Sequence, residues 1–75
     1  MHTLDELPLG GSCRVTHIDA TGSFMRRMLD LGVASGTKIT ALHKSICGDP
    51  VAYEIRGAVI ALRKEDAKNI SVQAL

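Results

Sequence analysis

The chain has 75 residues, of which 45% are hydrophobic and 23% are charged, a composition typical of a folded domain and not of a disordered chain. Nine basic and eight acidic residues give a net charge of +1, which removes the main electrostatic reason for binding nucleic acid or a membrane surface. A chain this short forms a small core without room for a deep cavity, so residues 1–75 are expected to be one domain with shallow surface sites.

The N-terminal residues predict a short lead-in to the fold. They include acidic side chains and no long apolar run, which is unlike a signal peptide, and no later segment has the roughly 18 continuous apolar residues of a membrane span. We therefore expect a cytoplasmic protein without membrane insertion. In a reducing cytosol Cys13 and Cys47 are expected to be two free, partly buried thiols, in preference to a disulfide.

Residues 12–18 predict a first strand, because Cys13, Val15 and His17 alternate and would share one side. A short helix should follow, with Ser23 as its N-cap. The helix is expected to pack an apolar stripe against the sheet and to end at a glycine that takes the left-handed conformation. That stripe consists of Phe24, Met28 and Leu31, and the glycine is Gly32.

Thr37–Lys44 predicts the second strand, in which the alternation slips between Ala41 and Leu42. Either a bulge or partial burial of both faces would account for the slip. Ser45–Pro50 is expected to be a loop, with Asp49 and Pro50 as turn-forming residues.

The next two strands predict a hairpin with a defined register. A two-residue turn at Arg56-Gly57 places all the apolar partners on one face. The expected pairs are Ile55 with Ala58, Tyr53 with Ile60, and Val51 with Leu62. Positive φ at Arg56 would make this a type I′ turn, and a type I turn with a glycine bulge is the alternative.

Residues 64–69 predict a helical turn, and Ile70 and Val72 a last strand. The expected fold is mainly β: a small SH3-like β-barrel of about five short strands. One short α-helix lies between the first two strands, and a helical turn precedes the last. Closure of the barrel would remove the exposed edges of an open sheet.

Several residues in this order resemble the FeoA family of ferrous iron transport accessory proteins, from about Leu7 to Val72. They are Gly11, Arg27-Met28, Leu31-Gly32, Gly36, Gly48-Asp49-Pro50-Val51, Ala61-Leu62-Arg63, Ala67 and Ile70-Ser71-Val72. Met28 stands where the family usually has leucine, a swap of similar volume that packing tolerates. The resemblance implies a cytoplasmic SH3-like adaptor that binds and modulates FeoB, the membrane ferrous iron transporter with a GTPase domain. The alternative is a metal-responsive regulatory module related to the C-terminal domain of iron-dependent repressors.

Four residues are predicted to contact the partner. Arg26 and Arg27 lie on the outer face of the predicted helix and Arg63 follows a strand; arginine is enriched at interfaces because its planar fork binds carboxylates. Ile46 is an apolar residue at a loop tip. The alternatives are a solvated helix face in which Arg26 pairs with Asp30, and a loop in which Ile46 is tucked in.

The sequence favours neither a metal centre nor an enzyme. Cys13 and His17 are four residues apart on a strand, roughly 13 Å, which is too far for one ion without a bend. We therefore predict no metal ligands, and at most weak binding of a divalent transition metal such as Fe²⁺ or Zn²⁺. No glycine-rich phosphate loop occurs, and Ser12, His17 and Asp19 form a chance threesome without an oxyanion-hole motif, so no catalytic residue is assigned.

Overall fold

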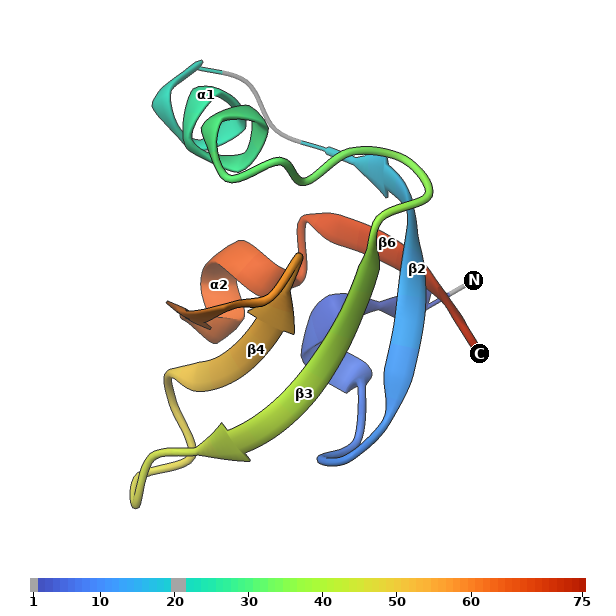
Figure 1. The fold of residues 1–75 in the computed structure, drawn as a ribbon. Helices are drawn as coiled ribbons and strands as arrows, with labels where there is room; N and C mark the ends of the chain where they lie inside the picture. Colours follow the sequence, from blue (N-terminus) through green and yellow to red (C-terminus); the bar gives the residue numbers. More distant parts are fainter. Residues whose placement is uncertain (1, 20–21) are drawn as a thin grey trace.

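The computed structural model describes residues 2–19 and 22–75 as a curved antiparallel sheet with short helices (Figure 1). In chain order the elements are β1 (His2–Thr3), the 3₁₀ helix η1 (Leu4–Glu6), β2 (Ser12–Ile18), α1 (Gly22–Asp30), β3 (Lys38–Lys44), β4 (Val51–Ile55), β5 (Ala58–Leu62), α2 (Lys64–Ala67) and β6 (Ile70–Ala74). The predicted mainly β architecture is confirmed, including the helix between the strands now labelled β2 and β3 and the helical turn before the last strand.

The six strands of the described residues form one sheet in the order β1-β6-β2-β3-β4-β5. The sheet curves as a barrel does, but β1 and β5 are its two edges and are not hydrogen-bonded to each other, so the expected full closure is wrong. The extra edge strand β1 and η1 arise from the lead-in segment. Because η1 contacts both α2 and β6, Leu4 is completely buried, and this segment completes the core instead of merely preceding it.

The core is built almost entirely from aliphatic side chains. Its buried members are Leu4, Cys13, Val15, Met28, Val33, Ile39, Ala41, Tyr53, Ile55, Leu62, Ala67, Ile70 and Val72. Tyr53 is the aromatic residue among them, and its hydroxyl donates a hydrogen bond to the Leu4 carbonyl at 3.5 Å. Burial raises the pKa of Tyr53 to about 12, and the negative charges of Asp5 and Asp49 add to the effect.

The hairpin of β4 and β5 has the predicted register. Ile55 is opposite Ala58, Tyr53 opposite Ile60 and Val51 opposite Leu62. Arg56 has φ of 52° and Gly57 has φ of 84°. Two successive positive φ values define the type I′ turn, which decides between the two turn types that the sequence left open.

β2 and β3, for which the sequence did not predict the strand register, each contain a β-bulge. In β3 the register shifts between Ala41 and His43, so the bulge at Leu42 accounts for the slip in the alternation. In β2 the register shifts between Val15 and His17. The extra residue turns His17 to the solvent while Val15 stays buried, so the expectation that they share one side is wrong.

Helix α1 packs its apolar stripe on the core and ends in a Schellman motif. The Val33 N–H donates to the Met28 carbonyl at 2.9 Å, and the Gly32 N–H donates to the Leu29 carbonyl at 3.0 Å. Gly32 has φ of +83°, as predicted for the residue that ends this helix. Met28 and Val33 are both completely buried, which supplies the apolar contact typical of the motif. The helix begins at Gly22, so Ser23 lies inside its first turn and is not the cap.

Candidate functional site

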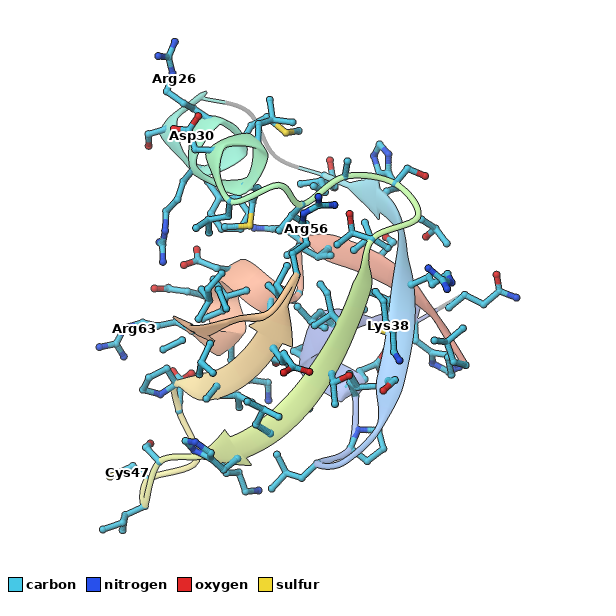
Figure 2. The ribbon with its side chains drawn as sticks, in the orientation of Figure 1. Arg26, Asp30, Lys38, Cys47, Arg56 and Arg63 are labelled. Carbon is cyan, nitrogen blue, oxygen red and sulfur yellow. The ribbon has the colours of Figure 1, made fainter. Side chains whose placement is uncertain are left out.

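Arg26 and Arg27 are exposed on α1, as the sequence predicts. Figure 2 shows Arg26 pointing away from the body of the protein. The ion pairs within the described residues join His2 to Glu6 and Arg63 to Asp49, so the alternative in which Arg26 pairs with Asp30 is not formed. Both arginines on this face are thus available to a partner.

Arg63 follows β5 and is tied to the loop between β3 and β4. Its Nη1 lies 3.8 Å from Oδ2 of Asp49. The other oxygen of this carboxylate, Oδ1, accepts a hydrogen bond from the Lys64 N–H at 2.8 Å, at the start of α2. Asp49 therefore joins the loop to α2, and the solvent-exposed Arg63 side chain is held near the loop.

The loop at residues 45–50 presents Ile46 to the solvent. Ser45 closes the loop twice: its N–H donates to the Pro50 carbonyl at 3.1 Å, and its hydroxyl donates to the Asp49 carbonyl at 2.7 Å. Ile46 is fully exposed at 106% of its reference area, so the alternative of a tucked-in anchor is wrong. The neighbouring Cys47 is a free, exposed thiol, whereas Cys13 is free and buried; burial raises the pKa of the Cys13 thiol.

The four predicted contact residues do not converge on one compact site. In Figure 2 Arg26 lies at one end of the molecule, Cys47 marks the loop at the opposite end, and Arg63 lies between them. Arg26, Arg63 and the loop marked by Cys47 lie along one side of the molecule in this view. A partner would have to cover much of that side to contact all four.

No metal-binding cluster of three or more His, Cys, Asp or Glu side chains occurs within residues 2–19 and 22–75. The bulge in β2 separates the solvent-exposed His17 from the buried Cys13, so these two potential ligands do not face each other. Elsewhere Nδ1 of His2 lies 3.7 Å from Oε1 of Glu6, which brings together only two potential metal ligands.

The structure also reveals a charged hollow that sequence reasoning missed. It has a volume of about 390 Å³, and its charged lining side chains are Arg14, Lys38, Arg56 and Glu54. We call it the basic hollow. In Figure 2 Lys38 lies between the ribbons of β2 and β3, and Arg56 lies near the chain that follows α1. The sequence places these charged residues at outward positions of three strands or their turns. Only the pairing of the strands shows that their side chains meet.

Comparison with known proteins assigns the family. The sequence model of the FeoA domain matches residues 2–74, nearly the whole chain. The chain belongs to the FeoA family. A curated relative, the Fe(2+) transport protein A/Fe(2+) transporter FeoB fusion protein of Porphyromonas gingivalis, is 33% identical over 72 residues. The match covers 96% of this chain and only 8% of the fusion protein, so the FeoA chain corresponds to a small part of that relative.

Solved structures of FeoA proteins share the fold. The FeoA protein from Chlorobium tepidum has a TM-score of 0.91 at 33% identity, over 97% of this chain and 70% of that one. Stenotrophomonas maltophilia FeoA, crystallised with zinc and described as an SH3 domain protein, has a TM-score of 0.86 at 30% identity, over 97% and 91% of the chains. The SH3-like fold expected from the sequence is therefore confirmed.

A manganese-dependent transcriptional repressor also shares this fold, with a TM-score of 0.87 at 21% identity, over 99% of this chain and 41% of that one. At this identity the likeness concerns the fold alone. The described α-helices α1 and α2 are both too short to reach across a membrane.

Proposed function

We propose that this FeoA-family chain is a cytoplasmic accessory protein of ferrous iron uptake that binds a FeoB-type transporter and modulates it. The observation that carries the proposal is the fusion protein of P. gingivalis, in which a region similar to this chain is joined to the transporter. Covalent linkage keeps two modules at a high effective concentration, an arrangement that favours modules that act together. The chain's small size and shallow hollows suit an adaptor better than an enzyme.

The side of the molecule that carries Arg26, Arg27, Arg63 and Ile46 is the proposed docking surface. Two arginines on α1 offer guanidinium groups for carboxylates, and Ile46 offers an apolar contact at the other end. This arrangement suits a large partner, because the contacts are spread along the molecule. Arg63 would contribute its free N–H donors while Asp49 holds its position.

The proposal is tested by co-purification of the tagged FeoA chain with the cytosolic region of the FeoB-type transporter from the same organism. A complex that survives gel filtration is the expected result. The double variant Arg26→Glu/Arg27→Glu should lose much of the transporter, and the variant Lys68→Glu, which changes an exposed charge after α2, should retain it. Failure of the unmodified chain to retain any transporter would refute the proposal.

The alternative function, a metal-responsive regulatory module, has support only from the fold shared with the repressor. This hypothesis predicts co-purification with a DNA-binding protein instead of the transporter. The zinc in the S. maltophilia FeoA crystal supports at most weak metal binding by the present chain, and no resident metal is proposed.

A further inference from the structure

The basic hollow brings like charges together at a cost to the fold. Arg14 and Lys38 are directly opposite each other on β2 and β3. Like charges at directly opposed positions of an antiparallel pair are destabilising. Neither residue, nor Arg56, belongs to the ion pairs found within the described residues, and Glu54 is the one acidic side chain in the lining, so the chain neutralises these cations only in part. An external anion would remove this repulsion.

Arg56 occupies a position that disfavours its residue type. Its φ of 52° lies in the left-handed region, where glycine, asparagine and aspartate are the usual residues. Its side chain runs along Gly32, close enough that a Cβ on Gly32 would lie 2.7 Å from Cδ of Arg56. The missing side chain at Gly32 therefore leaves room for the arginine, and this contact limits where the guanidinium can lie.

The lining of the hollow fits carboxylates on a chain better than a phosphate group. A phosphate cradle needs unpaired backbone N–H groups. Here the Gly36 N–H already donates to the Val15 carbonyl at 2.7 Å, and the Thr37 N–H donates to the Ala34 carbonyl at 3.0 Å. Arg14 spends one N–H on the Gly36 carbonyl at 3.0 Å, and its other N–H groups and the side chains of Lys38 and Arg56 remain as charged donors. The fork of a guanidinium matches a carboxylate.

Glu54 sharpens this preference. It lines the same hollow, opposite Thr40 on β3, so the four charged side chains together carry +2. A nucleic acid would find no aromatic ring for stacking in the lining. A flexible acidic peptide can place some of its carboxylates on the cations and turn the others away from Glu54.

We propose that the basic hollow binds an acidic segment of a partner protein, with carboxylates on Arg14, Lys38 and Arg56. The site is separate from the docking surface of Arg26, Arg27, Arg63 and Ile46. The inference goes beyond the proposed function, since it is tested without the transporter and can fail while transporter binding succeeds.

The test is a fluorescence polarisation titration of the full chain against labelled hexaglutamate at low salt. The variants Lys38→Gln and Arg56→Asn should each weaken binding about two- to fivefold, which is the range of an exposed charge pair. Asparagine tolerates the left-handed conformation at position 56, so this variant should fold. The variant Glu54→Gln should strengthen binding about twofold, because it removes the repelling carboxylate.

Matched controls change the same charges elsewhere. The variants Lys68→Gln and Glu65→Gln alter exposed residues that do not line the hollow, and they should bind hexaglutamate as the unmodified chain does. Equal effects of Lys38→Gln and Lys68→Gln would overturn the proposal, since binding would then follow net charge alone. Saturable binding of inorganic phosphate that depends on Lys38 and Arg56, without binding of hexaglutamate, would overturn it as well.

Discussion

Replacing Gly32 by alanine should destabilise the protein more than the same change at Gly36. Both glycines have positive φ, +83° and +92°, so a side chain at either position costs about 1–2 kcal/mol of backbone strain. The two positions differ in the free space around them. A Cβ on Gly32 would lie 2.7 Å from Cδ and 3.0 Å from Nε of Arg56, whereas nothing lies within 4 Å of a Cβ on Gly36.

The excess at Gly32 is the cost of moving Arg56. Because that side chain is long and exposed, it can rotate away, and a rotamer displacement costs about 0.5–1.5 kcal/mol. We therefore expect a loss of about 1.5–3.5 kcal/mol for Gly32→Ala and about 1–2 kcal/mol for Gly36→Ala. For a domain of this size, about 2 kcal/mol corresponds to a decrease in Tm of about 8–16 °C.

Thermal melts followed by circular dichroism, in the presence and absence of Arg56→Asn, separate the two contributions. In the Arg56→Asn background the difference between the two alanine variants should shrink to within error, because the crowding atoms are gone. If the difference persists in that background, the contact with Arg56 does not explain it. An unchanged Tm for Gly32→Ala would contradict the left-handed conformation of Gly32 at the end of α1.

Three further predictions concern the surface, the core and metal binding. The double variant Arg26→Glu/Arg27→Glu should bind the transporter more weakly with a nearly unchanged Tm, because both side chains are exposed; a large fall in Tm would show a structural role instead. Tyr53, the chain's one tyrosine, should ionise near pH 12 in the tyrosinate absorbance of the folded protein. Since this pKa is raised above its ordinary value of 10.0, the folded state holds the proton more tightly, so stability should fall as the pH rises from about 10 towards 12; a transition at the ordinary value would refute burial of the hydroxyl. Calorimetric titration with Fe²⁺ or Zn²⁺ should give no saturable heat in the micromolar range, and a tight stoichiometric site would contradict this.

The sequence predicted local features of the fold correctly where the spacing of apolar residues and a turn-forming residue indicated the same structure. The β4–β5 register followed from the Arg56-Gly57 turn and the alternation on both sides, and the end of α1 followed from Gly32. In both cases the deciding interactions lie within about ten residues of each other. Local chemistry is therefore enough to specify them.

Features that depend on distant strands were harder to predict. The bulge in β2 is visible only in its pairing with β6, and it moved His17 out of the face that the alternation assigned to it. Leu4 looked like part of a lead-in because its burial depends on contacts of η1 with α2 and β6. The candidate site shows the same limit. Exposure of Arg26 and Arg27 followed from the helical pattern, whereas the sequence left the exposure of Ile46 open, and the meeting of Arg14 and Lys38 requires the β2–β3 register.

We propose that this FeoA-family chain acts by binding a FeoB-type transporter. A calorimetric titration of the purified chain into the transporter's isolated GTPase domain, with and without guanine nucleotide, tests it most directly. We predict saturable one-to-one binding in at least one nucleotide state, weakened by Arg26→Glu/Arg27→Glu. Absence of binding in every nucleotide state, with both proteins folded, would contradict the claim.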